Sequence, residues 1–509
     1  MRLWLAILLS ALCGYLALSY ELLWFRVYLM AKGALGSCFA LLLGTYLLAL
    51  AAGAWLSRRF CRERASADAP KYFRLIANFL FVAYVLAFLS IPLYSWYCVA
   101  SYRESRIPWM ALAAGFIGIA FPLTAHVSIS VDSHAGPRLS YLYLANIVGS
   151  AAGSLLTGFC LMDLWPLRHL SLFLLLLGLA IVAALLARGG LTRRQLALRL
   201  SLLTAIGAGA ALITPRLFNG FYERLQLGPE YTSNYHFAHV LENRNSVITI
   251  TPEKVVHGGG TYDGAVNIDP KRPDINQIFR AYAVSALHAE PRQVLMIGLS
   301  LGSWAQVIAH HPAVEKLTVV ELNPGYLDLI RKYPEVASLL QNPKIEIVID
   351  DGRRWLNRHP DRKFDLIVSN TMAHWIASSA HVLSREFFEL VRAHLAPGGV
   401  YYYNSTSSGR SLKTAATVFT DVCRIASFVA ASDRRISFDL DRFREILTNY
   451  RIDGRRLFDP SNTEHRAELD RIVRALTYQD VPREKILSRT AALALITDDN
   501  MGYEWDDVL

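Results

Sequence analysis

Charged residues are scarce in this chain of 509 residues. Only 18% of them are charged, against about a quarter in ordinary soluble domains, whereas 53% are hydrophobic. The scarcity is uneven, because residues 1–57 contain only four charged side chains, while residues 240–509 have the composition of a globular domain. This distribution excludes a plain soluble enzyme, and it equally excludes a protein built only of membrane-spanning helices.

Cysteine is also rare. The six cysteines form no Cys-x-x-Cys pair, and five of them lie in or beside the apolar half of the chain. We therefore expect neither a disulfide framework nor a metal site, and we interpret the cysteines as small apolar side chains. A basic stripe interleaved with aromatic residues is missing as well, so the net charge of +10 does not predict nucleic acid as a partner.

Long apolar runs occupy residues 1–214. A helix needs about 20 apolar residues to cross a bilayer. Segments of about that length lie at residues 3–30, 35–57, 73–100, 107–131, 141–161, 169–187 and 196–214. The first segment is too long for a cleavable signal peptide, and further spans follow it. The sequence therefore predicts an α-helical, multi-pass transmembrane bundle with six or seven spans in the lipid bilayer.

Two features inside these spans point to specific contacts. An ionisable residue inside a membrane is a functional hypothesis by default. Glu21 and Arg26, in the first span, are expected either to lie near a helix end, to extend to the membrane interface or to pair with each other, or else to line a substrate or headgroup pocket. Gly149 and Gly153 have the spacing that lets two helices approach closely, which also permits a homodimer.

Arginine clusters indicate the orientation. Residues 58–74 hold five Arg and one Lys, and residues 188–199 hold four Arg, which the positive-inside rule places in the cytoplasm. Seven crossings would then put the C-terminal half outside. The last apolar segment is the weakest, and if it lies along the interface, six crossings leave that half in the cytoplasm. We expect this second arrangement, in the inner membrane of a bacterium.

Strands and helices alternate from residue 291 to the end of the chain. This alternation predicts an α/β domain with a parallel, Rossmann-like sheet over residues 291–509. Its strands are expected at residues 294–297, 317–320, 345–349, 364–368 and 400–403. Residues 215–290 are expected to form a linker and a small β region, with strands near residues 246–251 and 254–257. Residues 410–495 show helical patterns with charged faces and no motif.

Polar residues follow three of the expected strands. A glycine loop follows the first strand, an acidic residue ends the second, and two acidic residues follow the third. Ligands of open α/β sheets bind at the carboxyl ends of the strands, where glycines allow close approach and an acidic residue about 20 positions on binds a ribose diol. The pattern predicts a nucleoside site formed by Gly298, Ser300, Gly302, Glu321, Asp350 and Asp351.

Two other chemistries use similar glycine loops. The loop of NAD-binding proteins has a third glycine, which Gly298-Leu-Ser300-Leu-Gly302-Ser303 lacks. The same residues match the Gly-x-Ser-x-Gly pattern of hydrolases, but no Asp and His follow in an evident triad order. Both alternatives fit these residues less well than the nucleoside site.

Residues 246–407 resemble the spermidine synthase family, which has a class I methyltransferase-like fold and transfers aminopropyl groups. The resemblance rests on Val294–Gly302, Val319–Asn323, Asn342–Arg353, Phe364–Val368, Leu383–Phe388 and Leu395–Val400. Together with the apolar spans, the chain is similar to membrane-fused spermidine synthase-like proteins of bacteria. The resemblance implies that Glu321 binds the ribose hydroxyls and that Asp351 binds the adenine amino group.

The positions that bind the polyamine in this family carry other residues in this chain. The family has an aspartate where this chain has Leu301, and an Asp-x-x-Asp pattern where it has Asn370 and Ala373. A buried ammonium without such partners is costly. The sequence therefore argues against ordinary spermidine synthesis.

Other side chains take the place of these carboxylates. We expect His374 to act as a general base and Asn370 to orient the acceptor. The expected substrate pocket consists of Tyr262, Asp263, Trp375, Tyr402 and Asn404.

The leading hypothesis is a membrane-bound transferase of polyamine biosynthesis or related chemistry. It would use S-adenosylmethionine or decarboxylated S-adenosylmethionine as co-substrate, without a metal, and release methylthioadenosine by aminopropyl or alkyl transfer or by sulfonium cleavage. The acceptor would be a small amine or a lipid-associated molecule. One alternative is a methyltransferase with a membrane-associated acceptor, and another is a non-catalytic nucleoside sensor or transporter.

Overall fold

The computed structural model describes residues 2–61, 69–101, 108–130, 132–272, 275, 277–370 and 373–500. Contacts within the chain divide it into two compact units. Unit 1 consists of Met1–Phe237 and Glu242–Val247, and unit 2 consists of Ala238–Leu241 and Ile248–Leu509. Each unit is described by itself below.

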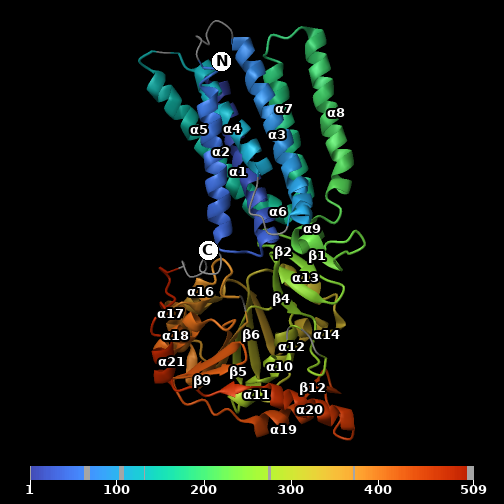
Figure 1. The fold of residues 1–509 in the computed structure, drawn as a ribbon, viewed down its shortest axis with the longest axis vertical. Helices are drawn as coiled ribbons and strands as arrows, with labels where there is room; N and C mark the ends of the chain where they lie inside the picture. Colours follow the sequence, from blue (N-terminus) through green and yellow to red (C-terminus); the bar gives the residue numbers. More distant parts are fainter. Residues whose placement is uncertain are drawn as a thin grey trace. The chain divides into compact units, whose positions relative to one another are not determined.

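Unit 1 is a bundle of long helices (Figure 1). Among the described residues, seven helices are long and apolar enough to cross a membrane. They are α1 (Leu3–Lys32), α2 (Ser37–Ser57), α3 (Ala69–Ala100), α4 (Pro108–Ser128), α5 (Ala135–Leu156) with its continuation η2 (Thr157–Leu161) and α6 (Met162–Leu164), α7 (Leu167–Leu186) and α8 (Arg193–Leu217). The short helices α9 (Phe221–Leu227) and η3 (Gly228–Glu230) follow. Each predicted apolar segment coincides with one long helix, and residues 62–68 of the first arginine-rich loop lie outside the described residues.

Helix α1 packs directly against α5 through glycine. A Cβ atom on Gly149 would lie 1.9 Å from the carbonyl oxygen of Ala11, and one on Gly153 would lie 2.4 Å from that of Tyr15. The two predicted contact glycines therefore face α1 of the same chain, where the missing side chains let the two backbones touch. This close contact fixes the relative position of the two helices.

Arg26 and Glu21 do not pair, so this part of the expectation is wrong. The guanidinium of Arg26 donates hydrogen bonds to the main-chain oxygens of Asn243 and of Ser246, the latter at 2.8 Å. Glu21 forms no hydrogen bond or ion pair with any described residue. The two side chains point to different surroundings because five residues of a helix separate them by about 140° around its axis.

Unit 2 begins with the predicted small β region. Its four-stranded sheet has the order β1 (His239–Glu242), β2 (Val247–Ile250), β3 (Val255–Gly258) and β4 (Thr261–Ala265). Strand β3 pairs antiparallel with both β2 and β4. The two strands expected near residues 246–251 and 254–257 are thus present as β2 and β3.

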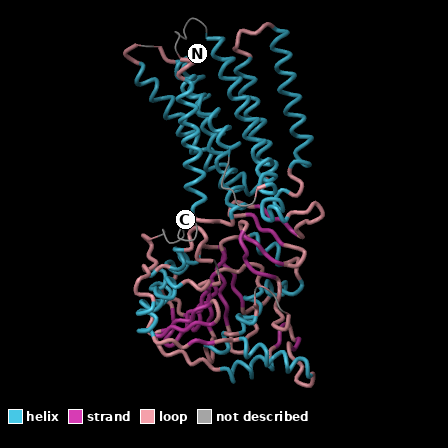
Figure 2. The backbone as a smooth tube through the Cα atoms, in the orientation of Figure 1, coloured by secondary structure: helices cyan, strands magenta, loops and turns pink. Residues whose placement is uncertain are grey.

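The main sheet of unit 2 has eight strands in the order β14-β10-β11-β9-β8-β5-β6-β7. Figure 2 shows the strands in magenta with helices beside them. The predicted strands are present as β5 (Gln293–Ile297), β6 (Lys316–Glu321), β7 (Ile345–Ile349), β8 (Phe364–Ser369) and β9 (Leu395–Asn404), and neighbours among them are parallel. The chain runs outward from β5 through β6 to β7 and then returns to the other side of β5 as β8. The resulting switch point between β5 and β8 is where such sheets bind ligands.

Helices and turns connect the parallel strands. They are α12 (Ser303–Ala309), α13 (Gly325–Ile330), α14 (Pro334–Ala337), η4 (Ser338–Gln341), α15 (Gly352–Arg358), α16 (Ala380–Leu383) and α17 (Arg385–Ala393). The short helices α10 (Phe279–Tyr282) and α11 (Val284–Leu287) precede β5. The sheet core is apolar on both faces, as expected for parallel strands covered by helices.

The expectation of helices throughout residues 410–495 is wrong in part. Strands β10 (Asp421–Ile425) and β11 (Phe428–Ser432) extend the sheet in antiparallel pairing beside β9. Every residue of β11 is buried, and a strand buried on both faces shows a continuous apolar run instead of alternation. The other elements here are α18 (Gly409–Val418), α19 (Leu440–Asn449), β12 (Arg451–Ile452), β13 (Arg455–Arg456), α20 (Thr463–Ala475), β14 (Tyr478–Gln479) and α21 (Arg483–Arg489).

The contact between α1 and α5 generates a first prediction. Gly149→Ala should destabilise unit 1 by about 1–3 kcal/mol, the usual cost of overpacking, because the new methyl group would overlap the main chain of α1. Gly136→Ala is the matched control in α5, since a Cβ there meets nothing within 4 Å. Thermal unfolding of both purified variants in detergent measures the difference, and equal melting temperatures would contradict the described packing.

Candidate functional site

The glycine loop after β5 adopts a left-handed backbone. Gly298 and Gly302 have φ angles of 89° and 81°, and Ser300 between them has a φ of 49°. Glycine adopts this conformation without steric cost. A Cβ atom on Gly302 would also lie 2.7 Å from Cδ2 of Leu339. The loop therefore requires glycine at both ends, for its turn and for its packing.

Glu321 holds this loop in place from the end of β6. Its Oε2 accepts a hydrogen bond from the N–H of Leu299, and its Oε1 accepts one from the N–H of Asn323, each at 2.7 Å. Burial raises the pKa of Glu321, and the backbone N–H groups around it partly offset that rise. The carboxylate thus joins the ends of β5 and β6, and a ribose diol would share its oxygens.

A second carboxyl group, Asp263 of β4, enters the same region. The hydroxyl of Tyr326 donates a hydrogen bond to Oδ2 of Asp263. Burial raises the pKa of Asp263 to about 7, the hydrogen bond from Tyr326 opposes the rise, the charge of Glu321 adds to it, and the hydroxyl of Ser300 opposes it. Asp263 therefore changes its charge in the neutral pH range. The sequence gives no signal for Tyr326.

Asp263 and the glycine loop line one small cleft at the switch point of the sheet, whereas Glu321 and Tyr326 are not among its lining residues. Its lining residues include Asp263, Gly298, Leu299, Ser300, Leu301, Trp304 and Asn370. The structure thus brings Gly298 and Ser300 of the predicted nucleoside site together with Asp263 and Asn370, the residues predicted to contact the acceptor. The indole N–H of Trp304 is buried without a hydrogen-bond acceptor among the described residues. A buried donor of this kind needs a partner, which a bound ligand can supply.

A chain of hydrogen bonds links Asn370 to His374 through the end of β9. The amide of Asn404 donates to Oδ1 of Asn370 at 3.2 Å, and Oδ1 of Asn404 accepts from the N–H of Thr406 at 3.0 Å. Oγ1 of Thr406 accepts from the N–H of His374 at 3.1 Å and lies 2.6 Å from its Nδ1. His374 can accept a proton at Nε2 when Nδ1 carries one and donates it to Thr406. Thr371 and Met372 lie outside the described residues.

Three other predicted pocket residues do not line the described part of this cleft. Tyr402 is fully buried, and its ring packs against those of Trp304 and Phe428 at 6.2 and 4.9 Å between centroids. Tyr262 and Trp375 are 38% and 37% exposed. The placement of Tyr402 gives it a packing role, whereas the other two side chains remain accessible to a ligand.

Asp350 and Asp351 are both engaged with α15. Oδ1 of Asp351 accepts the N–H of Arg354 at 2.8 Å and so caps this helix. Asp350 forms ion pairs with Arg354 and, at 3.5 Å, with Arg358. Contact of Asp351 with an adenine stays a prediction, because a ligand would share the oxygens that cap the helix.

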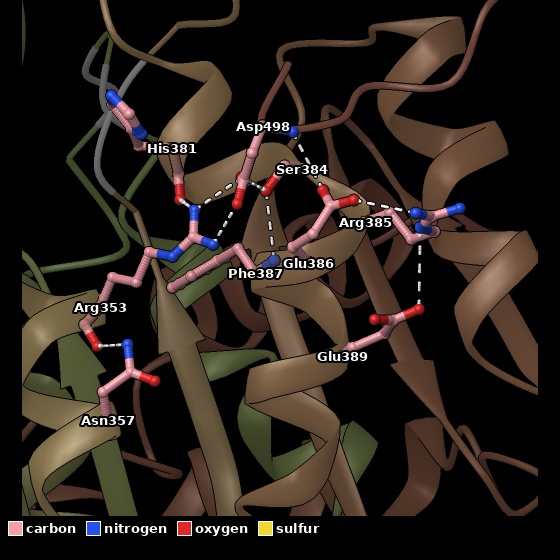
Figure 3. Close-up of polar contacts among 9 residues, drawn as sticks. All are labelled: Arg353, Asn357, His381, Ser384, Arg385, Glu386, Phe387, Glu389 and Asp498. Carbon is pink, nitrogen blue, oxygen red and sulfur yellow. Dashed lines mark hydrogen bonds and ion pairs between the residues drawn. The ribbon is translucent and has the colours of Figure 1, made fainter. Parts of the chain in front are cut away.

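The C-terminal segment is tied to the start of the same helix (Figure 3). Both terminal nitrogens of Arg353 donate to the carboxylate of Asp498, Nη1 at 2.7 Å. Oγ of Ser384 donates to Oδ1 of Asp498 at 2.7 Å, and the N–H of Asp498 donates to Glu386 at 3.0 Å. This clasp fixes α15, whose cap is Asp351, and the sequence signals it only by a dense run of polar residues near its end.

The fold and the cleft together define a Rossmann-like α/β domain with a small cleft at the carboxyl ends of β5 and β8, which Asp263 lines from β4. Within the described part of the chain, no group of three or more His, Cys, Asp or Glu side chains could hold a metal ion.

Comparisons with known proteins identify the family of this domain. Residues 281–432 match the spermine/spermidine synthase domain. The polyamine aminopropyltransferase of Desulforudis audaxviator (strain MP104C) is 29% identical over 139 residues, which are 27% of this chain and 50% of the relative. The spermidine synthase of Dictyostelium discoideum is 30% identical over 114 residues, which are 22% of this chain and 39% of the relative.

A crystal structure of spermidine synthase in complex with the transition state analogue AdoDATO aligns with a TM-score of 0.35 and 19% identity, over 47% of this chain and 87% of that one. The chain spans half or less of the length of the two curated relatives. The match of residues 281–432 to the spermine/spermidine synthase domain confirms the resemblance of the C-terminal half to spermidine synthases.

The buried carboxyl group of Asp263 generates a pH-dependent prediction. Its pKa is about 7 in the folded chain and 3.8 in a model compound, so the folded state binds more protons between these values and loses stability as the pH rises through them. Asp263→Asn should therefore raise the melting temperature at pH 8 by at least about 2–4 °C, which is roughly 1 kcal/mol for a domain of this size.

The gain in melting temperature of Asp263→Asn should be smaller at pH 5, where Asp263 is neutral in the folded chain. Asp361→Asn, which removes an exposed carboxylate, is the matched control and should change neither value. A gain that is the same at both pH values would contradict the burial of an ionisable carboxyl group at this position.

The clasp of the C-terminal segment generates another prediction. Asp498→Ala should destabilise unit 2 by about 1–2 kcal/mol, because it leaves Arg353 and Ser384 without their acceptor in a partly exposed site. It should also speed protease cleavage near the C-terminus. Asp499→Ala, at an exposed neighbour, is the control. Limited proteolysis followed by mass spectrometry of the fragments measures the effect, and identical cleavage rates would contradict it.

Proposed function

We propose that this chain is a membrane-bound transferase that transfers an alkyl group, such as an aminopropyl group, from a sulfonium nucleoside to an amine acceptor. The co-substrate is S-adenosylmethionine or its decarboxylated form, and the product is methylthioadenosine. The observation that carries the proposal is that Asp263 lines one cleft together with the glycine loop, which Glu321 holds in place, in a spermine/spermidine synthase domain.

The chemistry of the co-substrate fits this cleft. Its sulfur carries a positive charge, and two buried acidic side chains surround the place where the loop leaves room for a ligand. Opposite charges attract strongly where water is excluded. The absence of side chains at Gly298 and Gly302 supports close approach of a nucleoside to the backbone.

The reaction needs positioning and one base. The lone pair of the acceptor nitrogen forms a bond to the carbon beside sulfur, while the carbon–sulfur bond breaks and sulfur keeps its electron pair as a neutral thioether. The acceptor nitrogen then loses one proton. His374, whose Nδ1 lies against Thr406, is our candidate for that base, and Asn370 is our candidate for orienting the acceptor.

The residues that line the cleft limit how many charges the acceptor can carry. Leu301 is 1% exposed and lines the cleft at a place where the family has an aspartate. An apolar wall holds an ammonium group poorly. We therefore infer an acceptor that carries fewer charges than a polyamine, either a small amine or an amine on a lipid-associated molecule.

The long helices of unit 1 support a location in the cell membrane. The arginine-rich segments 58–74 and 188–199 favour the cytoplasm for themselves. Our proposal places the C-terminal half on the same side, where sulfonium nucleosides are made, and this requires that α8 lies along the membrane interface instead of crossing it.

Methyl transfer from S-adenosylmethionine is the second candidate. Two observations favour it: the buried N–H of Trp304 lacks an acceptor, and Leu301 replaces the aspartate that suits a free amine. A carboxylate, which S-adenosylmethionine has and its decarboxylated form lacks, would accept from that N–H. A nucleoside sensor or transporter without catalysis is the remaining alternative.

Mass spectrometry of the nucleoside products separates these functions. The purified full chain is incubated with each sulfonium nucleoside, and a lipid extract or n-propylamine serves as the acceptor source. We expect methylthioadenosine, whereas S-adenosylhomocysteine would establish methyl transfer. Neither product above the uncatalysed rate, with binding of the nucleoside intact, would establish a non-catalytic binder.

Replacement of the candidate base tests the mechanism. His374→Asn should lower kcat about 100-fold, a typical contribution of general base catalysis, while the KM for the nucleoside stays within about twofold. His381→Asn, at an exposed histidine of α16, should leave both constants unchanged. An undiminished kcat in His374→Asn would remove His374 from the mechanism without affecting the assignment of the products.

A further inference from the structure

Unit 1 contains a cavity of about 540 Å³ between α1, α2, α4 and α5, whose positions Figure 1 shows. This volume lies within the range of about 300–1,000 Å³ that is typical of small-molecule sites. Most of the lining is aliphatic or aromatic. The polar side chains that line it are Ser10, Glu21, Tyr46, Thr124, Asn146 and Ser150.

Two of these polar groups lack partners, whereas others are satisfied within the bundle. Oγ of Ser10 donates to the carbonyl of Leu142 at 2.8 Å, and Nδ2 of Asn146 donates to the carbonyl of Ser10 at 3.2 Å. The hydroxyl of Tyr46, a side chain that is 5% exposed, has no hydrogen-bond partner, and Glu21 has none among the described residues. Buried polar groups are normally paired, so the buried phenol of Tyr46 without a partner among the described residues points to a missing one. The half-buried carboxylate of Glu21 lines the same cavity, and together the two groups mark a binding site.

The cavity opens toward the outer surface of the bundle. Leu47, which lines it, is 52% exposed. In a membrane this surface faces lipid, so a ligand that enters here must dissolve in the bilayer and still carry a group for the carboxylate.

We propose that this cavity binds a primary monoamine with an apolar body, held in its ammonium form by Glu21. The ammonium donates to the carboxylate of Glu21 and leaves Tyr46 to donate or accept the remaining bond. The apolar body lies against the aliphatic wall formed by residues such as Leu43, Leu50 and Ile117. This site is separate from the cleft of unit 2, and the proposal does not depend on any transferase activity.

The single acidic side chain of the cavity favours a ligand with one ammonium group. Glu21 is the one acidic side chain that lines the cavity among the described residues. A second ammonium on the ligand would lie against apolar walls without a partner, which is costly. An alcohol of the same length would fill the cavity but leave the carboxylate without a counter-ion.

Competition binding tests the proposal on the full chain in lipid nanodiscs. Tritiated n-octylamine is the probe, and scintillation proximity measures its binding, with empty nanodiscs as the correction for partitioning into lipid. We expect saturable binding, and we expect n-octanol and 1,8-diaminooctane to compete at least tenfold more weakly than unlabelled n-octylamine. Equal competition by n-octanol would show that the cavity only takes up apolar molecules, and equal competition by 1,8-diaminooctane would overturn the choice of a monoamine.

Two variants locate the site. Glu21→Gln keeps the shape of the side chain and should weaken n-octylamine binding at least tenfold, while Glu230→Gln removes an exposed carboxylate of unit 1 and should not. Unchanged affinity in Glu21→Gln would overturn the proposal. Tyr46→Phe, which removes only the unpaired hydroxyl, should weaken binding about two- to fivefold. If Glu21→Gln does not fold, Tyr46→Phe and the competition series in the unaltered chain still decide the outcome.

Discussion

The cleft of unit 2 depends on the carboxylate of Glu321. It sits at the end of one parallel strand and accepts backbone N–H groups from the loop that leaves the neighbouring strand and from its own turn. These bonds hold Ser300 in its left-handed conformation and fix where Gly298 and Leu301 face the cleft. Charged hydrogen bonds of this kind are among the strongest in proteins, particularly where burial excludes water. The loop geometry is therefore a consequence of one buried acidic side chain.

A second acidic side chain turns this scaffold into an electrostatic site. Asp263 reaches the loop from the small β region and meets Ser300, Tyr326 and the charge of Glu321. Burial is the main reason why the pKa of Asp263 rises toward neutrality, and repulsion from the charge of Glu321 adds to the rise. A cationic ligand relieves this repulsion, so the same arrangement that costs stability in the free chain favours a sulfonium nucleoside when one is bound.

Strand positions and the glycine loop could be read from the sequence because each depends on local pattern. Apolar runs of β5 to β9 end in polar residues at the expected places, and the turn of the loop needs glycine at Gly298 and Gly302. Contacts between distant segments could not be read. Tyr326 meets Asp263 across 63 positions and Asp498 meets Arg353 across 145, and no spacing rule predicts either. Strand β11 escaped notice because it is buried on both faces and shows no alternation.

Glu321 and Glu21 differ in whether their oxygens already accept hydrogen bonds from the chain. This difference separates a carboxylate that supports the fold from one that is available to bind a ligand. Both oxygens of Glu321 accept backbone N–H groups, so this side chain mainly fixes the shape of the glycine loop. A ligand that binds Glu321 must share these oxygens with the backbone. Glu21 lies beside an unpaired phenol in a cavity and has no partner among the described residues. An acidic group left in such surroundings is retained against its desolvation cost only if something outside the fold offsets it. In unit 1 the ammonium of the ligand that we propose supplies this offset.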